Sequence, residues 1–433
     1  MLKNIPSVWF GWSGNVVEAG KVATQRIDQG RHAYVVTDLS EEDYQEYYNG
    51  FANRVLWPVL HYRIDLTEFT RRDLTGYFRV NRHFARELSQ ILEPDDFVWI
   101  HDYHLIPIAE ELRQQGHANR IGFFLHVPFP APEVMTVLPN HERLLPSLLQ
   151  YDLVGFQTET DVGNFVRYLV SEHRGTSQAF EATENQIVFT GGNRQTRIGS
   201  FPVGLDVDEF QRRARRAVQS SFVREVIESL GEKELVIGVD RLDYSKGLVQ
   251  RMDAFERFYE LHAEWRAKVT YLQIAPPSRS EIPEYSELEQ AVGGAAGRIN
   301  GKYGEVAWTP IRYLNRTYSR SALAGLYRSA RAALVTPLRD GMNLVAKEYV
   351  AAQDPDNPGV LILSRFAGAA GLVLALTFGF IGQGAAAAFA GAYAVLTVIG
   401  RLTAGFHLSK AAPSTQSPRP FSAIRRGATR TRK

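Results

Sequence analysis

The sequence predicts an α/β protein with two doubly wound parallel sheets. From about residue 30 to 365, short apolar runs alternate with amphipathic runs, a pattern typical of strands that alternate with helices. Nine strand-like runs are too many for one ordinary open sheet, so we expect two domains. A helix-like run over residues 207–230 separates the two groups of strands and is the expected connection. The length of 433 residues also fits two or three domains.

The predicted strands are short and mostly apolar. In chain order they are HAYVV (32–36), DFVWIHD (96–102), RIGFFLHV (120–127), LVGFQ (153–157), IGSFPVG (198–204), ELVIGVDR (234–241), KVTYLQIA (268–275), AALVTPL (332–338) and GVLILS (359–364). Stretches with helical periodicity lie between several of them, for example YFRVNRHFARELSQIL (77–92) and LVQRMDAFERFYELHAEW (248–265).

We therefore divide the chain into two domains, residues 1–205 and 206–365, an apolar segment at 366–400 and a basic tail at 401–433. The tail holds eight Lys or Arg and no acidic residue, which leaves 41 basic against 47 acidic residues elsewhere. The net charge of +2 therefore belongs to the tail and does not indicate nucleic-acid binding by the body. The chain has no cysteine, which excludes disulfides and thiolate metal sites and fits a reducing compartment.

Residues 366–400 contain no charged side chain, and three interpretations of this segment stay open. A membrane anchor is one, because the segment exceeds the roughly 20 residues that a membrane-spanning helix needs, and the basic tail would then stay in the cytoplasm. A change of reading frame is the second, and the abrupt switch to Ala and Gly favours it. A buried or disordered extension is the third. Under any of them we expect a disordered tail.

Ligands of parallel α/β sheets bind beyond the carboxyl ends of the strands, so polar residues there are candidates for a site. The motif VDRLDYSKG places Arg241 at a strand end and Lys246 five residues later, before Gly247. A planar guanidinium and a compact ammonium together suit a diphosphate. A solvated loop with incidental charges is the alternative interpretation.

The motif LRDGMNLVAKEY joins a turn at Asp340 to a predicted helix. Glu348 lies roughly two turns down this helix and could accept hydrogen bonds from a ribose diol. Alternatively, Asp340 caps the helix and Glu348 is an ordinary surface residue. The start of the helix would offer an anion the backbone N–H groups of Gly341, Met342, Asn343 and Leu344.

The motifs WIHDYH and FFLHVPFP add His101, Asp102, His104 and His126. The spacing of His101 and His104 suggests zinc, but we expect the two rings to diverge in a strand-to-loop turn, and no glutamate base lies between them. Hydrogen bonds to sugar hydroxyls, with Asp102 as an acceptor, fit the motif better. A core histidine is the alternative for His126.

Two further stretches have an ordinary structural interpretation. The tripeptide DVD at 206–208 is similar to a metal-binding motif of sugar-nucleotide enzymes, but it precedes a helical run, so we expect helix capping. The aromatic stretch 46–63, which includes Tyr48 and Trp57, is expected to lie in the core.

Eight motifs together carry a family resemblance: WFGWSG, EYYNGFANRVLWPVLHYR, VWIHDYHL, IGFFLHVPFP, VGFQTE, RLDYSKG, AGRINGKYG and TPLRDGMNLVAKEYVAAQDP. They are long, they stay in register over about residues 5–370, and they resemble the trehalose-6-phosphate synthases. The resemblance implies a GT-B fold, in which two Rossmann-like domains face a cleft. It also implies glucosyl transfer from UDP-glucose to glucose 6-phosphate with retention, by same-face attack or through a short-lived covalent intermediate.

Residue roles follow from the resemblance by position. It implies catalytic roles for Asp102, His126, Arg241 and Lys246. It implies donor binding by Arg241, Lys246, Asp340, Gly341, Met342, Asn343, Leu344 and Glu348, and acceptor binding by Tyr48, Trp57, Asp102 and Arg298. UDP-glucose and glucose 6-phosphate are the implied partners, with no metal, no cofactor and no nucleic acid. The expected location is the cytoplasm; homo-oligomers are compatible with the sequence, and membrane attachment through 366–400 is not favoured.

The chain also departs from the family pattern at both ends. We expect it to lack the family's first strand with its glycine-rich loop, and the family's ending after about residue 370. These losses predict little synthase activity, so a non-catalytic protein that binds sugar nucleotides or sugar phosphates is the rival hypothesis.

Overall fold

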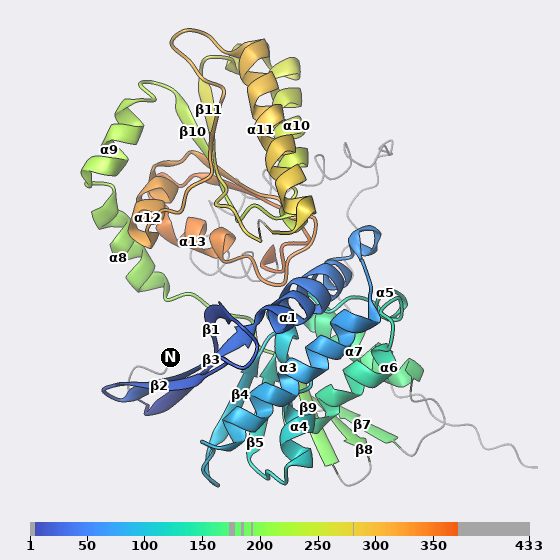
Figure 1. The fold of residues 1–433 in the computed structure, drawn as a ribbon. Coiled ribbons are helices and arrows are strands. Elements are labelled where there is room, and N and C mark those ends of the chain that lie inside the picture. The colour runs from blue at the N-terminus through green and yellow to red at the C-terminus, as the bar shows by residue number, and fades with distance from the viewer. Residues whose placement is uncertain (1–4, 173–177, 183–185, 192–193, 280, 371–433) are drawn as a thin grey trace, which may run out of the picture.

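In the computed structural model, the chain forms two α/β units that follow one another along the sequence (Figure 1). The first unit, blue to green in Figure 1, holds the strands up to β9, and the second, green to orange, begins with α8. The predicted α/β fold with two groups of strands is confirmed. The structure describes residues 5–172, 178–182, 186–191, 194–279 and 281–370.

The main sheet of the first unit has six strands in the order β4-β5-β6-β9-β8-β7. β4, β5, β6 and β9 are parallel, whereas β7 and β8 are antiparallel and close one edge. The carboxyl ends of the parallel strands therefore share one edge, where a ligand site is expected. The strands are β4 Phe97–His101, β5 Arg120–Phe124, β6 Leu153–Phe156, β7 Gln178–Ala182, β8 Ile187–Gly191 and β9 Arg194–Ser200.

The longest helix of this unit, α3, shows why the periodic stretches fold as helices. Thr70 caps it by accepting a hydrogen bond from the Asp73 N–H at 3.0 Å. Its apolar face is buried at Tyr77, Val80, Phe84 and Leu88, three or four residues apart. The helices are α1 Glu41–Asp43, α2 Trp57–Leu60, α3 Arg71–Ser89, α4 Ile108–Gln114, α5 Pro132–Met135, α6 His141–Leu144 and α7 Glu159–Glu172.

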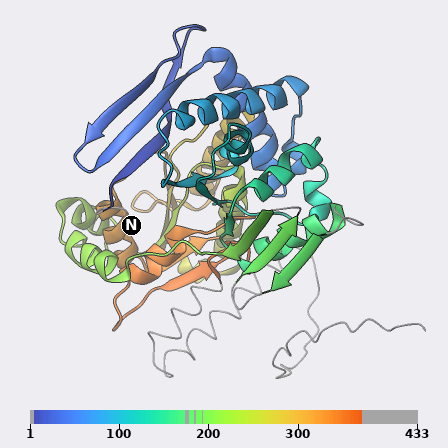
Figure 2. The same cartoon turned by 90° about the horizontal axis from the view of Figure 1, so that it is seen from below.

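A separate sheet in the order β1-β3-β2 lies at the outer edge of the first unit, in blue (Figures 1 and 2). The strands are β1 Ser7–Val17, β2 Thr24–Gln29 and β3 His32–Ser40. We predicted that HAYVV belongs to a doubly wound sheet, and this placement is wrong. Gly30, with φ of +62°, makes the tight turn between β2 and β3, so β3 pairs antiparallel with β2 in a local hairpin.

The aromatic stretch forms a π-helix, η1 (Tyr44–Leu56), that continues directly into α2. Phe51 and Val55 are fully buried, and Trp57 at the start of α2 is 4% exposed. The expectation that this stretch is mostly core is therefore confirmed. The same helix carries Tyr48, a half-buried residue that packs against the core.

The sheet of the second unit has five parallel strands in the order β12-β11-β10-β13-β14. Separate apolar clusters involve α10 and α11 on one side and α8, α12 and α13 on the other, as a doubly wound fold requires. The strands are β10 Glu234–Val239, β11 Val269–Ile274, β12 Ile311–Leu314, β13 Ala332–Val335 and β14 Val360–Leu363. The helices are α8 Val207–Ala217, α9 Ser221–Glu228, α10 Leu248–Leu261, α11 Pro283–Tyr303, α12 Arg320–Ser329 and α13 Leu344–Ala352.

The helix-like run 207–230, the expected connection, forms α8 and α9, and α8 packs into the core of the second unit. Asp206 caps α8, because its Oδ1 accepts a hydrogen bond from the Glu209 N–H at 2.9 Å. The capping interpretation of the DVD tripeptide is therefore confirmed.

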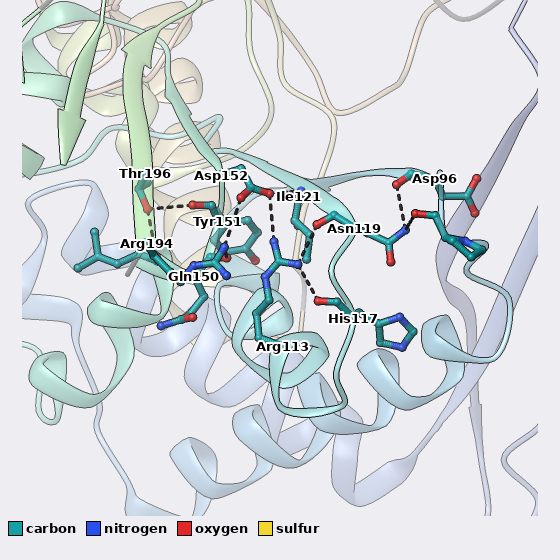
Figure 3. Close-up of polar contacts among 12 residues, drawn as sticks. Asp96, Arg113, His117, Asn119, Ile121, Gln150, Tyr151, Asp152, Arg194 and Thr196 are labelled. Carbon is teal, nitrogen blue, oxygen red and sulfur yellow. Dashed lines mark hydrogen bonds and ion pairs between the residues drawn. The ribbon is translucent and has the colours of Figure 1, made fainter. Parts of the chain in front are cut away.

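A polar network secures the amino ends of the main strands in the first unit (Figure 3). Asp152, just before β6, accepts hydrogen bonds from Arg113 Nη2 at 3.0 Å and the Ile121 N–H at 2.7 Å. Its other oxygen lies 3.3 Å from Arg194 Nη2 at the start of β9. Because ligands bind at the opposite, carboxyl edge of such a sheet, this network stabilises the fold and leaves the site to the other edge.

Within the described ranges, no helix has the length and apolar character that spanning a membrane requires. From residue 371 on, the apolar segment 366–400 lies outside the described residues, and so does the tail 401–433.

Candidate functional site

The carboxyl edges of the two parallel sheets meet where the units touch. β4 and β5 of the first unit lead to Asp102 and His126, and β10 and β13 of the second lead to Lys246 and Asp340. A Cβ atom on Gly341 would lie only 2.2 Å from the carbonyl oxygen of His126, so the two backbones are in direct contact there. The structure thus brings the four polar strand ends of the sequence to one place.

Lys246 and Asp340 form an ion pair between the loops that follow β10 and β13. Lys246 Nζ lies 2.7 Å from Asp340 Oδ2, and the two side chains are only 10% and 14% exposed. Burial alone would lower the pKa of Lys246, but the nearby carboxylates of Asp340, Asp243 and Asp240 outweigh burial and raise it. The ammonium therefore stays charged near neutral pH.

Arg241 lies beside this pair and faces the first unit. Its side chain is 51% exposed, with Nη2 3.9 Å from Asp243 Oδ2. The guanidinium carbon lies 5.6 Å from the centre of the Trp57 ring across the interface. Burial acts to raise the pKa of Asp243, but Lys246 and Arg279 hold it below its usual value. Arg241 thus adds a second cation to the loop that holds Lys246, and its N–H donors are exposed.

The start of α13 differs in one respect from the predicted anion site. Asn343, and not Asp340, caps the helix, because Asn343 Oδ1 accepts a hydrogen bond from the Ala346 N–H at 3.1 Å. The Asn343 N–H itself donates to the Ala367 carbonyl at 3.0 Å, so this N–H already has a partner in the structure. Asn343 Nδ2 instead donates to Asp340 Oδ2 at 3.0 Å and orients that carboxylate. The N–H groups of Gly341, Met342 and Leu344 stay predicted donors.

Glu348 lies in the middle of α13, and its side chain is 14% exposed, so it is not an ordinary surface residue. Its Oε1 accepts a hydrogen bond from Arg320 Nε at 3.2 Å. Burial raises the pKa of Glu348, and Arg320 opposes that shift. The Glu348 carboxylate can still accept hydrogen bonds from hydroxyl groups, because the contact with Arg320 uses only Oε1.

Asp102 has an unusual backbone conformation directly after β4. Its φ of +73° with ψ of 168° lies in a region that non-glycine residues rarely adopt. Its N–H donates to the Phe124 carbonyl at 2.8 Å, and its Oδ1 accepts from the His126 N–H at 3.2 Å. Burial raises the pKa of Asp102 to about 6, despite these backbone hydrogen bonds. The strained turn places an easily protonated carboxyl next to His126.

The histidines pair differently from a zinc site. His101 Nδ1 lies 3.0 Å from His126 Nε2, while the ring of His104 stacks on Tyr48 at 5.6 Å. His101 and His104 therefore diverge, as predicted. Burial lowers the pKa of His101 to about 4 and also lowers that of His126, so both rings are neutral near pH 7. In the described residues, one group with metal-ligand spacing was found, on α6 and at the end of α7: His141, Glu142 and Glu172.

An aromatic wall from the first unit faces these groups. Tyr48 stacks on Tyr44 with 5.6 Å between ring centres, and Trp57 lies under the guanidinium of Arg279, 3.9 Å from its carbon. Arg279 Nη2 also donates to Tyr103 Oη at 3.0 Å. Arg279 is 8% exposed at its side chain and is held by a contact of 3.6 Å to Asp243. A buried cation of the second unit is thus clamped onto aromatic rings of the first.

Sequence reasoning missed Arg279 and named Arg298 instead. Arg298 lies in the last third of α11 and pairs with Glu256 and Asp253 of α10. Both ion pairs join Arg298 to α10 and not to the first unit. Arg279 follows β11 in the segment PPSRS, at the same carboxyl edge as the other candidates. That fifth strand end was the signal that could have identified it.

A cavity of about 470 Å³ opens beside Asp340 and Met342 and is lined by both units. Arg339 forms part of its wall, with its guanidinium 4.0 Å from the ring of Tyr62 and 4.6 Å from that of Phe366. Space for a ligand therefore exists at the junction of the units.

Comparison with known proteins finds related sequences along nearly the whole described chain. The family model of glycosyltransferase family 20 matches residues 1–377. A trehalose-6-phosphate synthase of Sinorhizobium fredii is 51% identical over 370 residues, which are 84% of this chain and 77% of that protein. A trehalose-6-phosphate synthase of an Enterobacter species is 46% identical over 85% of this chain and 76% of the relative.

Solved structures agree with these relatives. An α,α-trehalose-phosphate synthase (UDP-forming) from Burkholderia xenovorans, in complex with glucose-6-phosphate, superposes with a TM-score of 0.81 at 46% identity, covering 85% of this chain and 80% of the other. A structure from E. coli bound with UDP-2-fluoro glucose gives 0.80 at 44% identity, covering 86% and 80%. The fold is thus that of the GT-B structures, and the chain belongs to glycosyltransferase family 20.

Proposed function

We propose that this protein transfers glucose from UDP-glucose to glucose 6-phosphate, with retention of configuration, and forms α,α-trehalose 6-phosphate. The observation that carries the proposal is the meeting of the two units at Gly341 and His126, which joins the Lys246–Asp340 pair to Asp102. Relatives that bind glucose-6-phosphate or UDP-2-fluoro glucose support the choice of substrates.

On the donor side, cleavage of the glycosidic bond leaves negative charge on the diphosphate. Lys246 and Arg241 would stabilise this charge as it forms, because both cations lie in the loop that follows β10. The start of α13 would add backbone donors, and Glu348 would accept hydrogen bonds from the ribose. These groups neutralise the leaving diphosphate, so we propose that the reaction needs no metal and no cofactor.

On the other side of the bond, Asp102 and His126 would bind the hydroxyl groups of the transferred glucose. The neutral ring of His126 and the carboxyl of Asp102 suit hydroxyl groups, which donate and accept hydrogen bonds. The acceptor phosphate would lie against Tyr48 and Trp57, where Arg279 supplies the cation that we had assigned to Arg298. The attacking hydroxyl then meets the donor sugar at the contact between the units.

The location and assembly of the protein complete the proposal. We place the reaction in the cytoplasm, because the lack of cysteine fits a reducing compartment. Self-association stays a prediction that light scattering can check.

The proposal is tested by mixing stoichiometric protein with UDP-glucose, with and without glucose 6-phosphate. We expect UDP release that depends on glucose 6-phosphate and is lost in Asp102→Ala. High protein concentration keeps even a slow reaction visible. UDP release that is independent of the acceptor would indicate hydrolysis, and no release at all would leave a binding protein.

A further inference from the structure

We propose that Arg251, a buried residue that no ligand reaches, sets the geometry of the donor-binding loops. It is a positioning residue, and the inference rests on the proposed donor site. Arg251 lies in the first turn of α10 and its side chain is only 1% exposed. It therefore acts through Lys246 and Asp340 and does not touch the substrate.

The guanidinium of Arg251 joins three segments that bear on the donor site. Nη2 donates to the carbonyl oxygen of Lys246 at 3.2 Å, and Nε donates to Thr336 Oγ1 at 3.1 Å. Nη1 donates to Asp240 Oδ2 at 2.8 Å, directly after β10, and to Gln273 Oε1 at 2.9 Å, in β11. One side chain thus fixes the backbone of the first loop and the beginning of the second.

The two loops are also closely fitted to each other at this point. The Leu338 N–H donates to the Ser245 carbonyl at 2.8 Å. Gly247 has φ of +65°, and a Cβ there would lie 2.7 Å from the Thr336 carbonyl oxygen. The geometry of the Lys246–Asp340 ion pair therefore depends on two loop backbones that are in close contact. Arg251 is hydrogen-bonded to both loops, at Lys246 and at Thr336.

Gly238 of β10 leaves the space that the guanidinium of Arg251 and its partners occupy. A Cβ on Gly238 of β10 would lie 2.9 Å from Arg251 Nη1, 2.6 Å from Gln273 Oε1 and 2.4 Å from Tyr271 Oη. The carboxylate of Asp240, whose side chain is also 1% exposed, lies 2.8 Å from Arg251 Nη1 and offsets the buried positive charge of Arg251. A lysine cannot reproduce the clamp, because a single ammonium cannot span acceptors on opposite sides of a planar fork.

The test compares Arg251→Lys with a matched control, Arg328→Lys. Arg328 is also a largely buried guanidinium, which donates to the Ala352 and Gln353 carbonyls and to Asp354 at the far end of α13. Circular dichroism first identifies a temperature at which both variants are folded. Calorimetry with UDP should then show at least tenfold weaker binding in Arg251→Lys and less than a twofold change in Arg328→Lys.

A second readout does not depend on the nucleotide. An amine-reactive label, quantified by mass spectrometry, reports how accessible Lys246 is. We expect severalfold faster labelling of Lys246 in Arg251→Lys, unchanged labelling in Arg328→Lys, and a smaller increase in the isosteric Thr336→Val. Thr336→Val also serves if Arg251→Lys does not fold.

Failure of the inference is distinguishable from failure of the proposed function. If the unaltered protein does not bind UDP, the donor site is wrong, and the labelling of Lys246 alone decides the role of Arg251. If Arg251→Lys and Thr336→Val both keep the original UDP affinity and labelling rate, Arg251 has no positioning role. Equal losses in Arg251→Lys and Arg328→Lys would overturn the inference in favour of general destabilisation.

Discussion

Lys246 and Asp340 are 94 residues apart in the chain, and their side chains form an ion pair of 2.7 Å between two loops of one sheet edge. The pair lies where the loops after β10 and β13 meet, near the contact of Gly341 with His126. A nearly buried ammonium is costly unless it is paired, and Asp340 pairs Lys246 directly at the edge where ligands of such sheets bind. We therefore regard this pair as the centre of the donor site.

Replacement of Lys246 by Ala should weaken UDP binding by about 1.5–3 kcal/mol, the usual range for a hydrogen bond to a charged group. Lys302→Ala is the control, since Lys302 is half-exposed and pairs with Glu256 and Glu260 of α10. Titration calorimetry measures both. Equal affinities in the two variants would remove Lys246 from the donor site.

Arg279→Ala and Arg298→Ala should separate the two candidates for the acceptor phosphate. Arg279 lies 3.9 Å from the Trp57 ring, so its loss should raise the KM for glucose 6-phosphate at least tenfold and spare UDP binding. Arg298 pairs with Glu256 on a distant surface, so its loss should change neither quantity. Steady-state kinetics and UDP titration give both values. The reverse pattern would restore the original assignment.

The buried carboxyl of Asp102 should make stability depend on pH. Its pKa is raised to about 6, so the folded state binds the proton more tightly than the unfolded chain does. The free energy of unfolding should therefore fall as pH rises from about 4 through 6, by at most about 3 kcal/mol. Asp102→Asn removes this loss and keeps the size and shape of the side chain at this unusual backbone position.

Urea unfolding of the protein and of Asp102→Asn at pH 4.5 and pH 8 measures this effect. We expect Asp102→Asn to be the more stable of the two at pH 8, with a smaller difference at pH 4.5. The same variant should lose activity at pH 8, because an amide does not replace the carboxylate acceptor. A pH-independent difference in stability would show that Asp102 does not titrate in this range.

Gly341→Ala should disrupt the contact between the units. The added Cβ would lie 2.2 Å from the His126 carbonyl oxygen, so the two backbones must separate. We expect a loss of glucosyl transfer of at least a hundredfold, because small displacements at reacting centres are costly. Gly294→Ala is the control. Gly294 lies inside α11, and apart from the helix's own backbone an added Cβ would have no atom of the described residues within 4 Å, so the change should stabilise the folded protein by about 0.5–1 kcal/mol. Transfer unaffected by Gly341→Ala would mean that the units need not meet there.

The sequence alone was sufficient for most strands of the two main sheets, and it indicated which strand ends carry polar residues. Strands such as ELVIGVDR and AALVTPL were recognisable because they are short, apolar and followed by polar turns, and the loops with Lys246 and Asp340 follow from that rule. The placement of HAYVV in a separate sheet was not predictable, since strand partners depend on long-range pairing and on the turn at Gly30.

The differences between the expected and the observed surroundings of the site residues also have physical reasons. Arg298 was chosen from its position in a motif, and a motif does not show which face of a helix a side chain occupies. Arg279 follows a strand end that was overlooked, and Arg251 lies inside a predicted helix. The importance of both comes from residues far along the chain, such as Trp57 and Thr336. The occupied N–H of Asn343 depends on the loop at Ala367, which follows a different strand.

The central claim, glucosyl transfer with retention at the junction of the two units, is tested most directly by NMR of the reaction product. The protein is incubated at stoichiometric concentration with UDP-glucose labelled with ¹³C at the anomeric carbon and with unlabelled glucose 6-phosphate. The account predicts one labelled product whose anomeric carbon is α-linked to the anomeric carbon of glucose 6-phosphate. A β-linked product, free labelled glucose or unchanged UDP-glucose after prolonged incubation would contradict it.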